Sequence, residues 1–390
     1  MRPNPTRLTA LVCALAFLDL ALWLAAVPLL PRWERELGLS KLESGIVVGA
    51  YSVSVLLASL PLGRIADRVG PKRMTVAGAI LFALAAPALA LADSFGELVA
   101  VRLAQGLFSA ISWTAGLAWI IGGAPPGRRA RSLALVNASA SAATLAGPAL
   151  GGPLVTAVGL TPAMAGFGGV AALCAAWALL EPEVRDARES RPSPLRELQA
   201  GVRSAKVRAS FAAILFVAGA AATVQLLAPL HLADEGMSDA NVGWVFTAAA
   251  VAALATTLVL TRVAGRIYRI GTMIGAAVAI GLGHALLAAG LPLPGYVADT
   301  VLLAVATAPL FILSYMLCAD GADETGTGAG AAMGALNTVW AAGALAAPFA
   351  AGALAGAAGD PLAFAGVAGA AALTAVGLAR TRRAEAAAAS

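Results

Sequence analysis

The stretch GRIADRVGPKR, residues 63–73, lies between two long apolar segments. It contains four basic side chains and the single carboxylate Asp67, and glycines stand at positions 63 and 70. A basic segment this short predicts a tight turn that joins two membrane helices. Loops rich in Lys and Arg favour the cytoplasmic side of a membrane. We therefore expect residues 63–73 to form a cytoplasmic turn in which Asp67 is free for a specific task.

The composition of the chain indicates a polytopic membrane protein. Of its 390 residues 60% are hydrophobic and 12% are charged, and the mean hydropathy is +0.84, a balance that soluble globular domains do not have. A membrane helix needs about 20 mostly apolar residues. Twelve such stretches begin near Leu8, Glu43, Met74, Glu97, Ser132, Pro162, Ala209, Asp239, Gly271, Gly295, Ala329 and Pro361. The sequence therefore predicts an all-α membrane protein with twelve transmembrane helices.

Neither a cleaved signal peptide nor a disulfide or metal site is expected in this chain. The first stretch runs about 23 residues to Leu30 without a clear cleavage site, so we interpret it as an uncleaved helix and not as a signal peptide. Cys13, Cys174 and Cys318 all fall in predicted spans. We expect them to be small core residues with no disulfide or metal role.

The distribution of basic residues predicts the orientation of the chain. With the N-terminus in the cytoplasm, all of the 26 Lys and Arg residues except Arg32, Arg35, Lys41 and Arg102 fall on the cytoplasmic side. This positive-inside pattern predicts that both termini are cytoplasmic. The alanine-rich composition indicates a bacterial source, so the expected location is the inner membrane of a bacterium. The net charge of +5 is then a topology signal, and nucleic-acid binding is not expected.

A polar, proline-containing segment divides the predicted helices into two sets of six. We expect domains at residues 1–181 and 209–390, joined by a cytoplasmic linker at 182–208. Basic residues of the linker either rest on anionic lipid headgroups or simply keep a connector solvated.

The two halves repeat each other at an offset near 200 residues. Two groups in the first half, in predicted helix five and around the loop at 63–73, have counterparts in the second. They are Asn137 with Asn337, Gly147-Pro148 with Ala347-Pro348, Gly152 with Gly352, Gly38 with Gly236, Gly45 with Gly243, and Arg64 to Arg68 with Arg262 to Arg266. Gly265 stands where Asp67 does, so only the first loop keeps its carboxylate.

The loop at 63–73 resembles the signature between helices two and three of the major facilitator superfamily. The matching residues are Gly63, Asp67, Arg68, Gly70, Lys72 and Arg73, and Pro71 departs from the pattern. The resemblance implies two pseudo-symmetric six-helix bundles, with helices one, four, seven and ten around a central site. It also implies a gating role for the six matching residues. We expect a monomer.

Asp19 lies near the middle of predicted helix one. An isolated carboxylate there costs roughly 2.5–3.5 kcal/mol on insertion scales, so it should face a cavity or a partner and not lipid. Burial disfavours the charged form of a carboxyl group, which lets it hold a proton near neutral pH and release it when water or a cation arrives. The alternative is a structural carboxyl group that bonds to a neighbouring helix.

Residues 17–31 resemble helix one of twelve-helix drug:proton antiporters, and Arg102-Leu103-Ala104-Gln105-Gly106 resembles their helix-four motif. The resemblance implies that Asp19 and Arg102 couple transport to protons. The expected cavity residues are Asp19, Trp23, Gln105, Trp113 and Gln225. Two alternatives stay open: Arg102 reaches the outer headgroups, and Trp23 only packs against a neighbouring helix.

Predicted helix five carries a row of small residues at four-residue steps, Ser139, Ala143, Gly147 and Gly151, on which another helix can approach closely. The run Gly147-Pro148-Ala149-Leu150-Gly151-Gly152 resembles the helix-five signature of exporters, although Ala138 and Ala143 replace its two upstream glycines. The alternative to an export signature is generic helix packing.

Three further polar residues have weaker predicted roles. We expect Asp67 to attract the N-terminal end of a cytoplasmic helix, near residues 326–330, and so to favour a state closed to the cytoplasm. Asp299 is either a second proton site or a carboxylate favoured by its helix dipole, and we prefer the dipole interpretation. His284 is expected to be a peripheral hydrogen-bonded residue.

The sequence contains no phosphate-binding loop, metal-ligand cluster or hydrolytic constellation. We therefore expect no enzymatic activity, no cofactor and no metal. The predicted function is proton-coupled export of small apolar or cationic organic compounds. Two alternatives are transport of a defined metabolite, such as a sugar or an amino acid, and a non-transporting sensor on the same scaffold.

Overall fold

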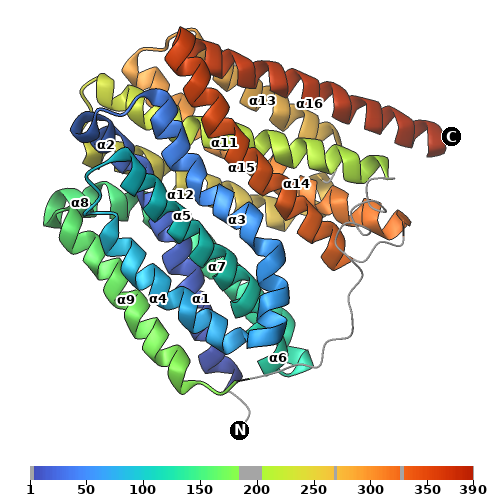
Figure 1. Cartoon of the computed structure of the whole chain (residues 1–390). Coiled ribbons are helices and arrows are strands. Elements are labelled where there is room, and N and C mark those ends of the chain that lie inside the picture. Colours follow the sequence, from blue (N-terminus) through green and yellow to red (C-terminus); the bar gives the residue numbers. More distant parts are fainter. Residues whose placement is uncertain (1–3, 184–203, 268–269, 326–328, 390) are drawn as a thin grey trace. The chain divides into compact units, whose positions relative to one another are not determined.

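The computed structural model describes residues 4–183, 204–267, 270–325 and 329–389. All regular secondary structure in these ranges is helical (Figure 1). The chain divides into two compact units. Unit 1 contains Met1–Arg188 and Gly236–Thr247, and unit 2 contains Glu189–Glu235 and Ala248–Ser390.

Unit 1 contains the helices of the first half. Its elements are α1 (Pro5–Ala25), η1 (Val27–Leu29), α2 (Leu30–Leu37), α3 (Lys41–Val69), α4 (Pro71–Ala88), α5 (Phe95–Ile111), η2 (Ser112–Gly116), α6 (Leu117–Gly123), α7 (Pro126–Gly151), α8 (Pro153–Val158) and α9 (Leu160–Leu180). Within the unit α1 packs on α7, α3 on α5, and α4 on α9.

Unit 2 contains the helices of the second half. Its elements are α11 (Ala205–Asp234), most of α12 (Asp239–Ile267), α13 (Ile270–Ala288), α14 (Leu293–Thr325), α15 (Ala329–Ala358) and α16 (Asp360–Ala389). Within this unit α11 packs on α14 and α15, and α13 packs on α14 and α16. Of the predicted linker, residues 184–203 lie outside the described residues, whereas Ser204 already caps α11.

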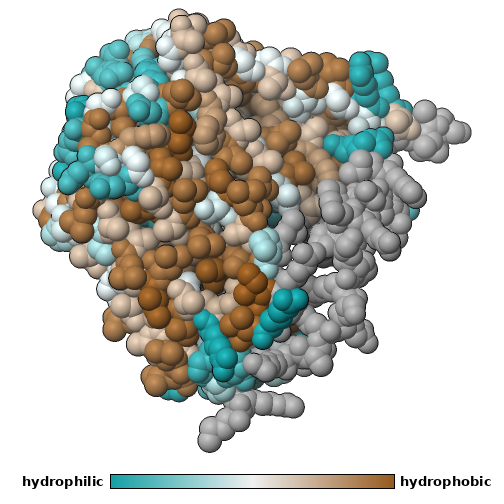
Figure 2. Space-filling view, in the orientation of Figure 1, coloured by the Kyte–Doolittle hydropathy of each residue, from teal (hydrophilic) through white to brown (hydrophobic). Residues whose placement is uncertain are grey.

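Eleven of the described helices or helix pairs are long and apolar enough to cross a membrane. The remaining predicted span is α4, whose 18 residues begin with Pro71, Lys72 and Arg73. Figure 2 shows the matching surface, with apolar side chains along the helix flanks and hydrophilic ones gathered toward helix ends. Large side chains such as Leu57, Leu84 and Leu173 are about 70% exposed on these flanks, as expected for a surface in contact with lipid. The predicted all-α membrane fold is confirmed.

Helix one is bent near its end. The α-helix stops at Ala25, a 3₁₀ turn follows at Val27–Leu29, and α2 continues the span from Leu30. Pro28 and Pro31 lie at this break, and proline cannot donate the backbone hydrogen bond that an α-helix requires. The expected span is therefore one crossing built from three pieces.

The expected turn at 63–73 is much shorter than predicted. Helix α3 continues through position 63 to Val69, and α4 begins at Pro71, so Gly70 alone forms the break. Gly70 has φ +100°, a conformation that only glycine adopts readily. The turn prediction was wrong because both helices extend beyond their apolar stretches: α3 continues past the end of the first stretch, and α4 begins before the second one. The surroundings of Gly63 and the side chains of Arg64 and Asp67 lie outside the described part of the chain. So do residues 326–328, part of the helix start that Asp67 was expected to attract.

The small residues of helix five lie against α1. Ser139 donates a hydrogen bond to the carbonyl of Cys13 at 2.8 Å. A Cβ atom on Gly147 would lie 2.8 Å from the Ala21 carbonyl oxygen, and one on Gly151 would lie 1.9 Å from that of Ala25. The two backbones therefore touch, and no larger residue fits between them.

Farther along, Gly152 ends α7 and Pro153 starts α8, so the span has a break as well as the internal Pro148. A Cβ atom on Gly152 would lie 2.6 Å from the carbonyl oxygen of Asp239, which also belongs to unit 1. The glycine pair at 151 and 152 is thus required by close backbone contacts on two sides.

We expect Gly151→Ala to destabilise unit 1 by about 1–3 kcal/mol, because the methyl group overpacks the α1–α7 contact. The matched control is Gly166→Ala in α9, where a Cβ atom meets nothing within 4 Å. Alanine has the higher helix propensity, so the control should be neutral or slightly stabilising. Thermal unfolding of the detergent-purified variants measures the difference. Equal melting temperatures for both variants would contradict the packing argument.

Candidate functional site

Asp19 is the centre of a buried polar cluster in unit 1. It lies in α1 and is 1% exposed. Its Oδ1 atom contacts the Tyr51 hydroxyl of α3 at 2.9 Å. Its Oδ2 atom accepts hydrogen bonds from the Ser109 hydroxyl of α5 at 2.6 Å and from Trp113 Nε1 at 3.0 Å. One carboxyl group therefore joins α1, α3, α5 and the π-helical turn η2.

The number of protons in this cluster indicates the state of Asp19. The Tyr51 hydroxyl also contacts Ser109 Oγ at 2.7 Å, so three oxygen–oxygen contacts close a ring. Each contact requires one proton, and the two hydroxyl groups supply one each. All three contacts carry a proton when Asp19 supplies the third one, which it donates to Tyr51 or, in the opposite sense of the ring, to Ser109. An ionised Asp19 leaves one contact without a proton.

Arg102 lies next to this ring on α5 and is also 1% exposed. Its Nε donates to the Val47 carbonyl at 3.3 Å, and its Nη1 donates to Gln105 Oε1 at 2.9 Å. The guanidinium lies 5.5 Å from the Tyr51 ring centroid. Among the described residues Arg102 forms no ion pair with Asp19, although both groups contact Tyr51. Its burial argues against the alternative in which it reaches the headgroups.

Local sequence explains how Tyr51 is held. Gly106 follows Gln105 on α5, and a Cβ atom there would lie 2.0 Å from the Tyr51 carbonyl oxygen. Glycine thus lets α5 touch α3 at the level of the cluster. Trp23, one turn after Asp19, stacks on the Tyr51 ring with 5.6 Å between centroids and an interplanar angle of 19°. The predicted cavity residues Trp23, Gln105 and Trp113 therefore gather around Asp19.

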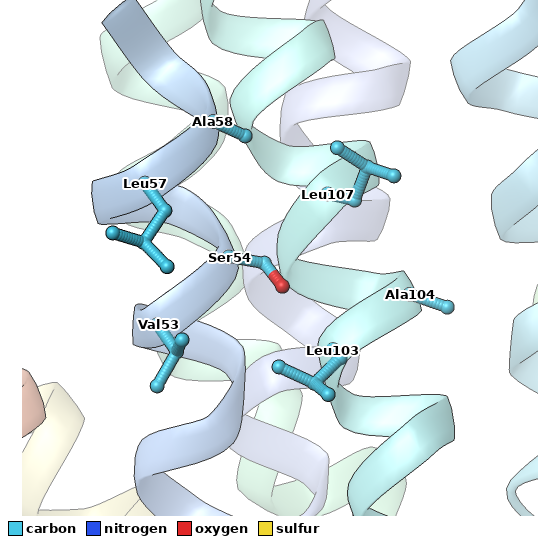
Figure 3. A pocket seen from close by; sticks show the side chains of 7 residues that line it. All are labelled: Val53, Ser54, Leu57, Ala58, Leu103, Ala104 and Leu107. Atoms are coloured by element: carbon cyan, nitrogen blue, oxygen red, sulfur yellow. The ribbon is translucent and has the colours of Figure 1, made fainter.

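An apolar pocket of about 400 Å³ opens between α3 and α5. Figure 3 shows its lining, in which Ser54 points its hydroxyl toward α5 among aliphatic side chains. The lining residues are Val53, Ser54, Leu57, Ala58, Leu103, Ala104 and Leu107. The pocket follows the same two helices that carry Tyr51 and Arg102, and it offers mainly apolar contact.

The predicted gating residues that the structure describes hold the end of α9. The Lys72 backbone N–H donates to Glu183 Oε1 at 3.2 Å, and its Nζ donates to the Leu179 carbonyl at 2.7 Å. A Cβ atom on Gly70 would lie 2.8 Å from Glu183 Oε1. Arg68 and Arg73 are exposed. The carboxylate of Glu183 therefore lies against the start of α4, a contact that was not predicted from the sequence.

The remaining candidates belong to unit 2 and are not part of the Asp19 cluster. Gln225 lies half-buried in α11. Asp299 is 6% exposed and lies beyond the first turn of α14, where a helix dipole acts weakly. His284 is buried and its Nδ1 lies 2.8 Å from the Ile280 carbonyl. Nowhere in the described ranges do three or more potential ligands form a metal site.

A model of the Major Facilitator Superfamily matches residues 11–332. The chain belongs to the Major Facilitator Superfamily. Its members are transporters, and the similar curated proteins include drug-resistance exporters.

Three curated relatives illustrate the similarity of this facilitator. It is 28% identical over 159 residues to the tetracenomycin C resistance and export protein of Streptomyces glaucescens, covering 40% of this chain and 29% of the relative. It is 27% identical over 138 residues to the quinolone resistance protein NorA of Staphylococcus aureus, covering 35% of each. It is 32% identical over 150 residues to the staphyloferrin B transporter of S. aureus, covering 37% and 36%. In these matches the chain spans about a third of the relatives' length.

Two solved structures share the facilitator fold. The nucleoside transporter NupG aligns with a TM-score of 0.77 at 14% identity, over 96% of this chain and 98% of that one. A bacterial homologue of the lysosomal transporter Spinster aligns with a TM-score of 0.73 at 14% identity, over 98% and 96%. At this identity they show the fold alone.

Sequence reasoning missed two members of the Asp19 cluster in this facilitator, Tyr51 and Ser109. Ser109 continues the α5 face of Arg102 and Gln105, a spacing visible in the sequence. Tyr51 is a polar aromatic residue inside a predicted span, but nothing in the sequence shows which helix it faces.

We expect difference infrared spectra of the purified protein at neutral pH to contain a protonated carboxyl band that Asp19→Asn removes. Ser109→Ala should shift this band, because it deletes the 2.6 Å hydrogen bond to Oδ2. The matched control is Ser112→Ala, a buried serine that is not among the three described hydrogen-bond partners of Asp19. A wild-type spectrum without a band assignable to Asp19 would overturn the proton count.

Proposed function

We propose that this facilitator is a proton-coupled exporter of small apolar or cationic organic compounds. It would work by alternating access between functional halves at residues 1–181 and 209–390, joined by the linker 182–208. We place it in the cytoplasmic membrane of a bacterium as a monomer, with both termini in the cytoplasm. Asp19 and Arg102 carry the coupling.

The observation that carries this proposal is the closed hydrogen-bond ring around Asp19. The protonated carboxyl group is satisfied by Tyr51, Ser109 and Trp113. Loss of the proton leaves a buried carboxylate with one contact unsatisfied, which is costly in a water-poor site. A cation or water that reaches Asp19 would compensate this charge. Proton and substrate would therefore exclude each other at Asp19, which is the requirement for antiport.

Arg102 supports the proposal because it makes the loss of the proton feasible. Its permanent charge lies over the Tyr51 ring, at 5.5 Å from the ring centroid. A nearby cation stabilises a carboxylate. Without Arg102 the protonated state of Asp19 would be too stable to release its proton during a transport cycle.

The substrate class rests on the surroundings of Asp19. Trp23 and Trp113 offer aromatic faces, which attract organic cations. A polar metabolite needs several convergent hydrogen-bonding groups. The names of two relatives, a tetracenomycin C resistance and export protein and a quinolone resistance protein, support an organic compound as substrate.

The test is a proton-gradient assay in inverted membrane vesicles that contain the protein and a pH-sensitive dye. We expect at least one compound from a panel of dyes and antibiotics to dissipate the gradient in wild type, and Asp19→Asn to abolish the response. The matched control is Asp93→Asn, which neutralises an exposed carboxylate at a helix end and should respond as wild type does.

Two results would redirect the proposal. A response confined to nucleosides, sugars or amino acids would identify a metabolite transporter. Identical behaviour of wild type and Asp19→Asn for every compound would refute proton antiport through Asp19.

A further inference from the structure

Arg102 and Gln105 form a group of hydrogen-bond donors beside the Asp19 ring. Gln105 Oε1 accepts from Arg102 Nη1 at 2.9 Å, which fixes the amide so that Nε2 is the remaining donor. Gln105 is 2% exposed, and its Nε2 has no hydrogen-bond partner among the described residues. Ser44, one turn before Val47 on α3, is also fully buried with an unpartnered hydroxyl. The group is therefore rich in donors and poor in acceptors.

The charge of this group is also uncompensated. A guanidinium has five N–H groups, and two of them donate to described acceptors, Val47 O and Gln105 Oε1. The titratable groups that act electrostatically on Arg102 are Tyr51 and Asp19. When Asp19 is protonated and Tyr51 is neutral, Arg102 is the one charge left in the cluster. A buried charge without a counter-charge and a buried N–H donor without an acceptor both cost free energy.

We propose that Arg102 and Gln105 bind an anion, either a small inorganic anion such as chloride or the carboxylate of an organic compound. Both offer the acceptor lone pairs and the negative charge that the group lacks. Guanidinium and amide N–H groups are strong donors to anions. Ser44 lies one turn before Val47, whose carbonyl accepts from Arg102, and its buried hydroxyl is a further unpartnered donor on α3.

Anion and proton binding are linked in this arrangement. An ionised Asp19 competes with the anion for the charge of Arg102, whereas a protonated Asp19 does not. The anion therefore binds together with the proton, and by reciprocity each increases the affinity for the other. This step rests on the proposed function only in using Asp19 as the proton site. It adds a co-ion that enters and leaves with the proton, opposite to the exported compound.

The experiment uses purified full-length protein in detergent, in weakly buffered medium containing isethionate as the bulky reference anion. Chloride is added in one arm and benzoate in the other, and a pH indicator measures proton uptake. We expect saturable uptake in wild type that is absent in Asp19→Asn and in Arg102→Gln. Arg129→Gln, which removes a cation at the start of α7, is the matched control and should retain the uptake.

A second measurement does not depend on the folding of the Arg102 variant. Tryptophan fluorescence reports binding, because Trp113 Nε1 donates to Asp19. Asp19→Asn mimics the protonated carboxyl group, so it should bind the anion at least about fivefold more tightly than wild type at neutral pH. Gln105→Leu should weaken binding in both backgrounds.

The outcomes separate the two sources and the two proposals. A response to chloride assigns the site to an inorganic anion, and a response to benzoate alone assigns it to an organic carboxylate. Equal anion affinity in wild type and Asp19→Asn, or no proton uptake with either anion, would overturn the anion site. Because no exported compound is present, failure here leaves the efflux result intact, and absence of efflux leaves the anion result intact.

Discussion

A carboxyl group inside a membrane protein must find its hydrogen-bond partners on other helices, because lipid supplies none. In this facilitator the partners of Asp19 come from α3, α5 and the π-helical turn that follows α5. The group therefore has a structural role in unit 1. It determines how closely four pieces of unit 1 must approach, and the glycine at position 106 is the steric condition that lets α5 reach α3.

The same cluster explains why a permanent cation lies in the middle of a membrane unit. Arg102 forms no bond to Asp19 among the described residues; its guanidinium lies over the ring of Tyr51, whose hydroxyl contacts Asp19. A direct ion pair would strongly favour the charged form of Asp19. Without that pair the attraction is weaker, and it disfavours the protonated form of Asp19 less.

Much of this structure was predictable from the sequence, and what was missed has a physical reason. The spans and the burial of Asp19 follow from composition, spacing and the cost of a charge in lipid, whereas the family follows from the resemblance of residues 63–73 to its loop signature. Tyr51 and Ser109 were missed because a contact between two helices depends on how each helix is rotated about its own axis. A membrane helix that is apolar on all sides does not reveal this rotation in its sequence. The turn at 63–73 was predicted too long because helix α3 continues past its apolar residues into the polar region, where hydropathy no longer marks it. The roles assigned to Asp19, Arg102 and Gln225 stay predictions.

The π-helical turn at Ser112–Gly116 has a consequence for the whole of helix four. A π turn holds one residue more than the α-helix around it, so the chain on its two sides is out of phase by one position. Arg102, Gln105 and Ser109 lie before the turn, and Trp119, whose Nε1 bonds to the Pro182 carbonyl at 3.2 Å, lies after it. A helical wheel drawn with a constant α-helical period through residues 95–123 would therefore misplace Trp119 by the rotation of one residue, roughly 100°. Deleting one residue from this turn would rotate the following segment and move Trp119 away from the Pro182 carbonyl, while the residues that contact Asp19 from α5 stayed in phase.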